Sequence, residues 1–298
     1  MNGQHPGRAV VVGVDGSADA LRAVRWAVPE ARRRRAVLRL VHAFAWTDER
    51  AVGMLGLGRE AYGDRLRVLA HRALATAIAV AAELDPDVTV ESDLVLGTPA
   101  GVLQEQSRSA ELLVVGDRGR GRLTSMLAGS VAVAMAAHAA CPVVVVRGST
   151  ATDPAAGPLP VVVGVDGTPL SEAALAFAFD AASARRAPLV VVHTWLDGLA
   201  DPEMAPLVDW RGLAEDEEIA LAERLAGWGE KYPDVAVERV IVEGRATEVL
   251  RDRTQGAQLV VVGSRGHGEF AGFVLGSVSS ALVHRTGCPV AVVRSTEA

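Results

Sequence analysis

Two glycine-rich stretches of the chain carry the residue types that bind anions. Residues 116–119 read Gly-Asp-Arg-Gly, and after nine intervening residues 129–130 read Gly-Ser. Residues 263–266 read Gly-Ser-Arg-Gly, and 276–277 again read Gly-Ser at the same spacing. Glycines at these points let backbone N–H groups converge on one ligand atom. The spacing therefore predicts two phosphate-binding loops.

The residues around each loop predict where it lies. The apolar runs 112–115 and 259–262 precede the loops as strands, and helical patterns follow them. A helix N-terminus carries partial positive charge and unpaired N–H groups, which suits an anion. We therefore expect phosphate contacts from the helix starts and the nearby arginines: Ser130, Val131, Ser277, Val278, Arg118, Arg122 and Arg265. A tight turn without a ligand is the alternative for either loop.

Neither loop matches the common nucleotide-binding fingerprints. The Gly-Lys-Ser/Thr triplet of a P-loop is absent, and the only lysine of the chain is Lys231. A dinucleotide fingerprint needs its glycines after the first strand, where 13–17 read Gly-Val-Asp-Gly-Ser. No set of nucleophile, base and orienting group stands out either. The sequence predicts binding, with hydrolysis slow or absent.

Asp15 and Asp166 end the first predicted strand of each half. A carboxylate there could accept a ribose hydroxyl, or hold a phosphate-bound metal ion through water. The alternative is an Asx turn that helps to start the next helix. No residue is predicted as a direct metal ligand.

The ends of the second strands are further candidates for ligand contacts. The backbone of His42 and His193, or that of Val41 and Val192, could pair with the edge of a base. The alternative is that each histidine bonds to a neighbouring loop. No histidine has metal-ligand spacing with a cysteine or an acid.

The two halves of the chain repeat each other. Residues 11–17 match 162–168 at an offset of 151, whereas Asp87 and Asp234 are offset by 147. The four-residue difference is expected in the loop after the second strand, where length changes cost least. The repeat predicts domains over 1–148 and 160–298, joined by a linker rich in Pro, Ala, Ser and Thr over 149–159.

Strands alternate with helices in each half. In the first half we expect strands over 9–14, 36–43, 88–95, 112–115 and 143–146, and helices over 17–34, 59–84, from 98 and over 130–138. The first helix should bury Leu21, Val24, Ala27 and Val28, and its arginine run 32–35 should be a solvated end. The second half repeats this order, with strands near 161, 189, 235, 259 and 290.

Continuous valine runs as strands indicate a parallel sheet that helices cover on both faces. Each half is therefore predicted as an open, doubly wound α/β domain of five strands. Ligands of such sheets bind at the carboxyl ends of strands where the strand order reverses. Because Asp15 and the loop at 116–119 follow strands one and four, we expect the order 3-2-1-4-5.

Net charge, cysteine content and the length of the apolar runs limit the possible functions further. The net charge of −6 argues against a nonspecific nucleic-acid binder. Cys141 and Cys288 occupy matching places before a proline and a valine-rich run, which favours two small buried residues over a disulfide or metal site. No apolar run approaches the roughly 20 residues of a membrane span. We expect a cytoplasmic protein.

These motifs together resemble the universal stress protein family. The resemblance rests on Gly-x2-Gly-x9-Gly-Ser after strand four, on Val-Gly-Val-Asp-Gly-Ser at the start, and on a final Cys-Pro-Val strand. It covers both halves, as in tandem members of an actinobacterial type. It implies an adenine nucleotide α-hydrolase-like fold, and ATP, with Mg²⁺, in each half. The implied contact residues are Gly13, Asp15, Val41, Gly116, Asp117, Arg118, Gly119, Arg122, Gly129, Ser130 and Val131, with Gly164, Asp166, Val192, Gly263, Ser264, Arg265, Gly266, Gly276, Ser277 and Val278.

The resemblance also implies a role and a mode of assembly. ATP would be a regulatory or sensed ligand in a stress response; a slow ATP hydrolase and an interaction module with purely structural loops are the alternatives. Family members dimerise through the last strand, so 143–146 and 290–293 are expected to pair within the chain or in a homo-oligomer. Asp117 departs from the family's usual Ser or Thr, and a carboxylate beside phosphates repels them unless it points away or holds a metal. The first site is therefore expected to be the weaker.

Overall fold

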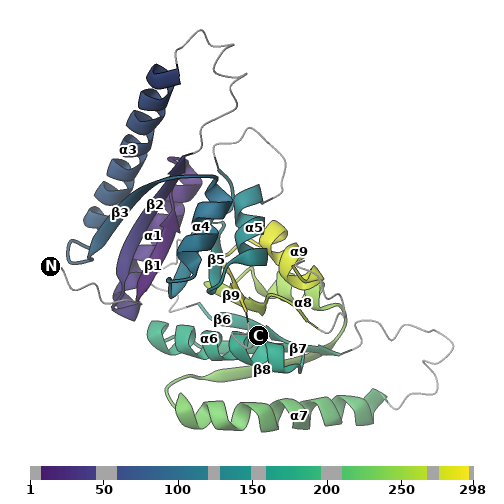
Figure 1. The fold of residues 1–298 in the computed structure, drawn as a ribbon. Helices are drawn as coiled ribbons and strands as arrows, with labels where there is room; N and C mark the ends of the chain where they lie inside the picture. The colour runs from purple at the N-terminus through teal and green to yellow at the C-terminus, as the bar shows by residue number, and fades with distance from the viewer. Residues whose placement is uncertain are drawn as a thin grey trace. The chain divides into compact units, whose positions relative to one another are not determined.

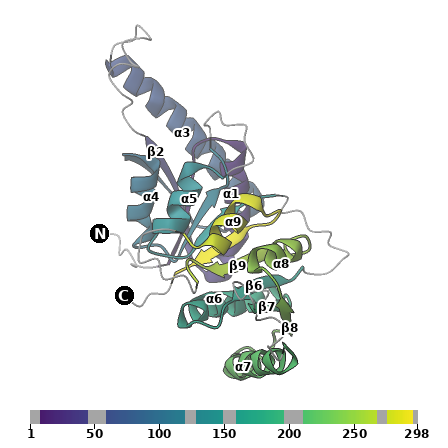
Figure 2. The ribbon, with the colours of Figure 1, turned by 90° about the vertical axis from the view of Figure 1, so that its right-hand side faces the viewer.

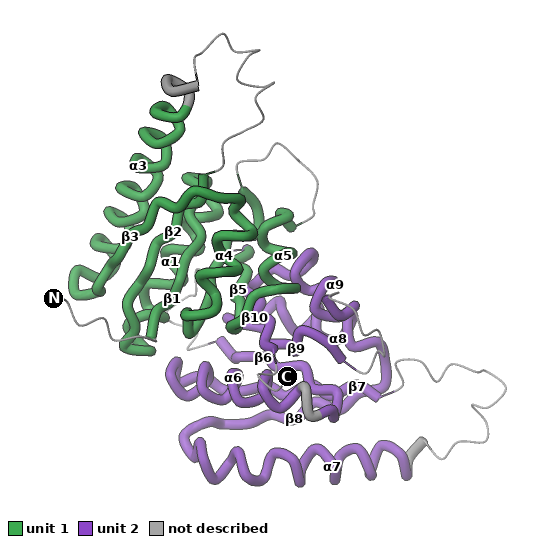
Figure 3. The backbone as a smooth tube through the Cα atoms, viewed as in Figure 1, with its two compact units in different colours: residues 1–147 green, residues 148–298 purple. Residues whose placement is uncertain are grey.

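Strands and helices alternate in both halves of the chain, as the sequence predicts (Figure 1). The structure, a computed structural model, describes residues 8–44, 59–119, 128–148, 159–195, 210–266 and 275–294. The chain divides into two compact units, which are residues 1–147 and 148–298 (Figure 3). Apart from Leu159, the linker predicted over 149–159 lies outside the described residues.

Unit 1 has five strands and four helices among its described residues. In chain order they are β1 (Ala9–Gly13), α1 (Ala18–Arg34), β2 (Val37–Phe44), α3 (Arg59–Leu84), β3 (Val90–Leu96), α4 (Pro99–Ser107), β4 (Leu112–Gly116), α5 (Ser130–His138) and β5 (Val143–Val146).

The described part of unit 2 repeats this order. Its elements are β6 (Val161–Val165), α6 (Pro169–Arg185), β7 (Leu189–Trp195), α7 (Trp210–Lys231), β8 (Val237–Glu243), α8 (Ala246–Arg253), β9 (Leu259–Gly263), α9 (Ser277–Arg285) and β10 (Val290–Val293).

All the strand pairs within each unit are parallel, and the predicted strand order is confirmed. In unit 1, β2 pairs with β3 and β1, β1 pairs with β4, and β4 pairs with β5. In unit 2, β7 pairs with β8 and β6, β6 pairs with β9, and β9 pairs with β10. The order therefore reverses between β1 and β4, and between β6 and β9. Those are the points where an open α/β sheet forms a ligand crevice.

Helices cover the two faces of each sheet. In unit 1, α1 and α3 pack together on one face and α4 and α5 on the other; α8 and α9 likewise pack together in unit 2 (Figures 1 and 2). The strands at the switch points are buried except at their glycines: Val10, Val11 and Val12 have no exposed surface, and neither does Leu259. Strands covered on both faces need apolar residues at every position, which explains the continuous valine runs.

Helix starts follow their capping residues. Ser17 Oγ accepts a hydrogen bond of 3.1 Å from the Ala20 N–H, and Thr98 Oγ1 accepts one of 3.3 Å from the Gly101 N–H. The helices α4 and α6 both carry proline in their first turn, where its missing N–H costs no hydrogen bond. These caps fix where each helix leaves the sheet.

The third strand of each unit begins two residues later than predicted, at Val90 and Val237. The Val88 N–H donates instead to the Asp85 carbonyl at 3.2 Å, and the Val235 N–H donates to the Tyr232 carbonyl at 3.1 Å. These bonds close turns at the ends of α3 and α7. Val88 and Val235 therefore belong to turns, although valine is a residue type typical of strands.

The four-residue difference between the halves lies in a helix, so its predicted place in the loop is wrong. The helix α3 has 26 residues and α7 has 22, and both start at the offset of 151 that holds for the first strands. Four residues are about one helical turn. A whole turn can be lost while the remaining residues keep the same face toward the sheet.

The predicted surface of α1 is wrong in two places. Leu21 is only half-buried, and Ala20, Ala23 and Ala31 complete the buried face instead. Arg34 is not a solvated helix end, because its side chain is only 11% exposed and lies against two carboxylates. Its Nε donates to Glu30 at 2.6 Å and its Nη1 to Glu111 at 3.0 Å.

Candidate functional site

Where the glycine-rich loop of unit 1 leaves β4, its backbone packs closely against α1. A Cβ atom added to Gly116 would lie 2.7 Å from the carbonyl group of Asp19, in the first turn of α1. The loop returns at Gly129, whose N–H donates to the Asp117 carbonyl at 2.6 Å. In unit 2 the Gly276 N–H donates in the same way to the Ser264 carbonyl at 2.9 Å. Both loops are thus closed rings between a strand end and a helix start.

The second glycine of each loop faces an aspartate. A Cβ on Gly119 would lie 2.7 Å from Asp15 Oδ2, and a Cβ on Gly266 would lie 2.8 Å from Asp166 Oδ2. The structure therefore brings the loop and the aspartate together, as the sequence predicts. Only glycine lets the backbone approach the carboxylate this closely.

The other oxygen of each aspartate has a structural role. Asp15 Oδ1 accepts from the Ser17 N–H at 2.9 Å, and Asp166 Oδ1 accepts from the Thr168 N–H at 3.0 Å. These are the Asx turns that the sequence left as the alternative, and the intervening Gly16 has a φ of 82°. The turn fixes each carboxylate so that Oδ2 points at the loop. The two interpretations of the aspartates are therefore compatible.

The helices that follow the loops start without a side-chain cap. Gly129 and Gly276 are the N-cap residues of α5 and α9, and no side chain accepts a cap hydrogen bond there. The first-turn N–H groups of a helix need an acceptor from outside it. Ser130 and Ser277 are exposed at these starts, and Val131 and Val278 are half-buried beside them.

Other predicted residues are occupied by packing. A Cβ on Gly13 would lie 2.9 Å from Leu103, so this glycine lets α4 approach β1; Gly164 meets Leu250 in the same way at 2.8 Å. Val41 and Val192 are each 1% exposed, which leaves only their backbone for a ligand. The Val41 carbonyl already accepts from the Val14 N–H at 2.8 Å. Arg122 lies outside the described residues.

His193 follows the alternative interpretation, a side chain bonded to neighbouring elements. Its Nδ1 lies 3.0 Å from the Val165 carbonyl oxygen and its Nε2 lies 3.0 Å from Glu217 Oε2 on α7. This ring connects the end of β6 to α7. His42, the matching residue of unit 1, is half-buried at the end of β2.

Asp117 lies in an ionic cluster with Asp19, Arg22, Arg118 and Arg147, which we call the Asp117 cluster. Its carboxylate is 3.3 Å from Arg147 Nε, 3.4 Å from Arg118 Nε and 3.5 Å from Arg22 Nη2. Burial raises the pKa of Asp117, the nearby Asp19 raises it further, and the charges of Arg147 and Arg118 offset only part of this. The carboxylate thus points into a set of arginines, which is one of the two ways in which it could avoid a phosphate.

Unit 2 keeps two of the three arginines of this cluster, as Arg265 and Arg294, but neither of its acids. Ser264 stands in place of Asp117 and is buried at 7% exposure. Its N–H donates to the Val293 carbonyl at 2.8 Å, as the Asp117 N–H donates to Val146 at 3.2 Å. Arg294 follows β10, and burial lowers its pKa, with a smaller contribution from Arg265.

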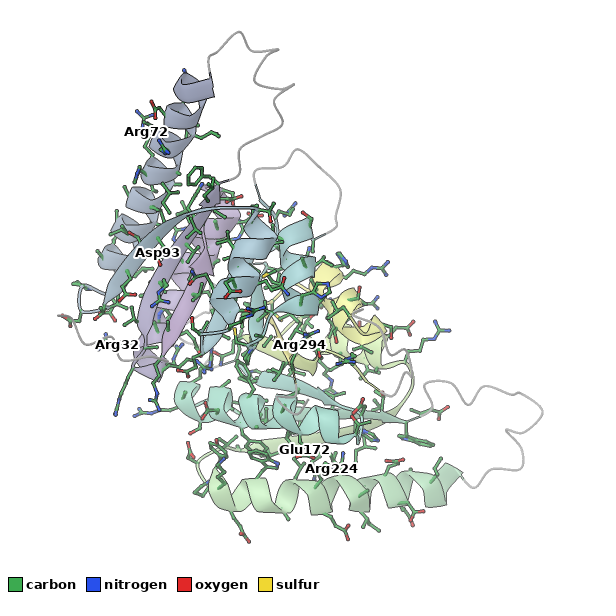
Figure 4. All side chains as sticks on the ribbon, viewed as in Figure 1. Arg32, Arg72, Asp93, Glu172, Arg224 and Arg294 are labelled. Carbon is green, nitrogen blue, oxygen red and sulfur yellow. The ribbon has the colours of Figure 1, made fainter. Side chains whose placement is uncertain are left out.

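Several residues near the loops were not predicted from the sequence. Arg147 and Arg294 follow the final strands at the offset of 147, so comparing the repeats residue by residue would have found them. Arg224 of α7 lies 3.5 Å from Glu172 (Figure 4), and its guanidinium is also 3.5 Å from the position of a Cβ on Gly167. No signal in the sequence pointed to that contact, because α7 is remote from the loop in the chain.

The described residues also bear on metal binding and on membrane insertion. Over the described ranges, no group of three or more His, Cys, Asp or Glu side chains could hold a metal ion. The same part of the chain has no helix that is both long and apolar enough to cross a membrane. Cys141 and Cys288 are buried thiols, and burial raises the pKa of each to about 12, so neither is a nucleophile at neutral pH.

Fold and loops together define a class: tandem doubly wound α/β proteins with a closed glycine loop at each switch point. A sequence model of the universal stress protein family matches residues 7–147 and 159–294. The chain belongs to the universal stress protein family. The resemblance that the motifs indicated is confirmed over both halves.

Relatives and solved structures agree with this assignment. Universal stress protein Rv2005c of Mycobacterium tuberculosis is 40% identical over 295 residues, which covers 96% of this chain and 97% of the relative. Universal stress protein Rv2623 of the same organism is 38% identical and covers 99% of both chains. A universal stress protein structure from Archaeoglobus fulgidus matches with a TM-score of 0.71 over 97% of both chains at 18% identity, which supports the fold.

Proposed function

We propose that the protein binds ATP, with Mg²⁺, in one crevice of each unit, and that the bound nucleotide regulates a role in the cytoplasmic stress response. One observation carries the proposal: each unit holds a closed glycine loop between a strand end and an uncapped helix, with an aspartate aimed at the loop. The Gly-x2-Gly-x9-Gly-Ser spacing, which marks ATP-binding members by resemblance, occurs at both places.

The residues present fit a phosphate ligand. The N-caps of α5 and α9 are glycines without side-chain cap bonds, so the first-turn N–H groups can donate to an anion. Arg118 and Arg265 are exposed on the loops and can add positive charge. In this proposal Gly119 and Gly266 leave room between loop and aspartate.

The aspartates fit a hydroxyl or a hydrated cation better than a directly bound metal. One oxygen of Asp15 and of Asp166 is already engaged in an Asx turn, and the other, Oδ2, lies beside the second glycine of the loop. A single carboxylate oxygen can accept from a ribose hydroxyl or from a water on Mg²⁺. We assign these residues to positioning the ligand rather than to chemistry.

The test is calorimetric titration of the full chain with MgATP. Wild type should bind at two sites, and Gly119→Ala and Gly266→Ala should each remove one site, because the new methyl group would clash with an aspartate oxygen. Gly256→Ala is the matched control, since nothing lies within 4 Å of its added Cβ. No binding to wild type, or unchanged binding in both loop variants, would contradict the proposal.

The same preparations separate regulation from hydrolysis. Release of ADP that needs Mg²⁺, and that Asp15→Asn and Asp166→Asn abolish while MgATP still binds, would favour a slow ATP hydrolase. Binding without ADP release supports the regulatory role. Sedimentation of the same samples tests whether copies associate, as the proposed pairing of final strands between chains requires.

A further inference from the structure

The start of the unit 1 loop is surrounded by compensating charges. In the Asp117 cluster, three arginines contact Asp117. In addition, Arg22 lies 2.6 Å from Asp19 and Arg118 lies 3.5 Å from Asp19. The Asp117 side chain is only 3% exposed. Three arginines therefore share two carboxylates beside the loop that would hold phosphates.

The matching positions of unit 2 have a different charge. Counted at the offsets of the repeat, they hold Leu170, Ala173, Ser264, Arg265 and Arg294. The formal charge of these five positions is +2 in unit 2 and +1 in unit 1. Both acids are lost together with Arg22, so the two units differ in their whole ionic arrangement and not in one side chain alone.

Asp117 is close enough to the loop for its charge to matter. Its own carbonyl closes the ring by accepting from Gly129, the N-cap of α5. A Cβ on Gly129 would lie 3.2 Å from that carbonyl and 3.4 Å from Arg118 Cα. The Asp117 carboxylate itself lies 3.4 Å from Nε of Arg118, a residue of the loop, and in a partly buried site a charge at such close range is screened much less than in bulk water. It therefore offsets part of the positive charge that would attract each further phosphate of a ligand.

The arginines also behave differently toward a ligand in the two units. In unit 1, Arg118 and Arg147 contact the Asp117 carboxylate, so a polyphosphate would compete with an internal anion for them. In unit 2, a serine hydroxyl at that place offers no such competition. The charge of the ligand thus changes binding energy more in unit 2 than in unit 1.

We infer that Asp117 sets phosphate-number selectivity: the unit 2 loop strongly prefers nucleoside triphosphates, whereas the unit 1 loop accepts nucleoside mono- and diphosphates almost as well. This inference rests on the proposed function, because it specifies which nucleotides the two loops take. Asp117 and Ser264 are the specificity-determining pair.

The experiment measures Kd for ATP, ADP and AMP with Mg²⁺ on the full chain, one site at a time. Gly266→Ala silences unit 2 for measurements on unit 1, and Gly119→Ala silences unit 1 for measurements on unit 2. The ratio of ATP to AMP affinity should be at least about tenfold larger for unit 2. In unit 1, Asp117→Ser should raise the ratio by about tenfold, toward the unit 2 value.

A second variant keeps the test independent of folding. Asp117→Asn preserves the shape of the side chain and removes its charge, so it should raise the ratio in the same direction as Asp117→Ser. Asp93→Asn removes one charge from the exposed edge strand β3 and should leave the ratio unchanged. A purely structural role of Asp117 would change stability but not the ratio.

The outcomes separate the two proposals. If neither unit of the wild type binds any nucleotide, the proposed function fails and this inference fails with it. If both units bind with the same ATP-to-AMP ratio, or if Asp117→Asn leaves the ratio of unit 1 unchanged while binding persists, the inference alone is overturned.

Discussion

The two units have the same order of strands and helices but differ in the charged side chains beside the glycine-rich loop. In unit 1, Asp117 is buried among Arg22, Arg118 and Arg147, whereas unit 2 has Ser264 at that position. The ring-closing hydrogen bond at the loop is nevertheless present in both. The hydrogen bond that closes the loop and the glycines beside it are therefore the same in both units, whereas the side chains around them differ.

A second difference concerns the helix packed over the first helix of each unit. In α3 the fully buried positions are small: Ala70, Ala77 and Ala81 are at most 1% exposed. Counting back from Pro86 and Pro233, the matching residues of α7 are Glu217, Arg224 and Trp228. The alanines allow α3 a close approach to α1, and the larger side chains make α7 depend on specific contacts.

Those contacts are aromatic and ionic. Trp228 stacks on Phe179 of α6 with ring centroids 5.3 Å apart, and Tyr232 stacks on the same ring at 5.5 Å. Glu217 contacts His193 at the end of β7, and Arg224 contacts Glu172. The helix α7 is thus connected to α6 and β7 by aromatic and ionic contacts, whereas the fully buried positions of α3 are alanines.

The largest expected effect is on the buried ion network of unit 1. Glu30 is 1% exposed and bonds to Arg34, whereas the matching residue in unit 2 is Ala181. The charges of Glu30 and Glu111 raise the pKa of Arg34 although its burial acts to lower it. Glu30→Ala should destabilise unit 1 by about 3 kcal/mol, because it leaves a buried cation short of a partner.

Hydrogen exchange in β1 and β6 measures this unit by unit. The loss should appear in β1, with β6 changing less. Glu105→Ala is the control, since its pair with Arg108 is exposed and should change stability by less than about 0.5 kcal/mol. A loss below about 1 kcal/mol for Glu30→Ala would show that the network is dispensable and that the units are more alike than their charges suggest.

The aromatic stack should give the next largest effect. Trp228→Ala should destabilise unit 2 by about 2 kcal/mol, because it removes a partly buried ring and its stacking on Phe179. The reciprocal change Ala81→Trp should destabilise unit 1 by about 2 kcal/mol through overpacking against α1. Urea unfolding with hydrogen exchange in each unit measures both. Tolerance of Ala81→Trp would contradict the close α1–α3 contact.

Helix capping should separate the units more weakly. Ser17 caps α1 through its side chain, so Ser17→Ala should cost unit 1 about 1 kcal/mol. Thr168 makes no cap bond, and its hydroxyl donates to Asp166 instead at 2.6 Å, so Thr168→Ala should cost unit 2 about 0.5 kcal/mol. Thermal unfolding followed by exchange checks the order. Equal losses would mean that the two helix starts are energetically the same.

The smallest effect concerns pH. The pKa of Asp117 is raised in the folded protein, so protonation stabilises unit 1. That contribution is fully present below the ordinary value of 3.8 and is lost as the pH rises through the folded pKa. The stability of wild type relative to Asp117→Asn should therefore fall, by less than about 1 kcal/mol, from about pH 4 to about pH 7.

Unit 2 provides the comparison for this titration. Ser264→Asn introduces no ionisable group, so its difference from wild type should not vary with pH. Urea unfolding at a series of pH values measures both differences. If the stability of wild type relative to Asp117→Asn instead increases with pH, the arginines rather than burial determine the pKa of Asp117.

The sequence alone determined the strands, the loops and the strand order. Valine runs are strands because both faces of each sheet are covered, and the glycines of the loops stand where a Cβ would strike Asp19 or Asp15. The pairing of Asp15 with the loop followed from its place after a strand next to β4. These are local patterns combined with a general rule for open α/β sheets.

Tertiary structure decided which charges meet. Asp19, Asp117 and Arg147 lie on three separate elements, and nothing local to any of them shows that they form one cluster. The same holds for Arg34 with Glu111, which lie 77 residues apart in the chain. Backbone hydrogen bonding repeats with a short period and leaves a pattern in the sequence, whereas an ion pair between distant elements depends on how helices pack. The sequence therefore located the loops, and only the packing around them made the two units chemically unequal.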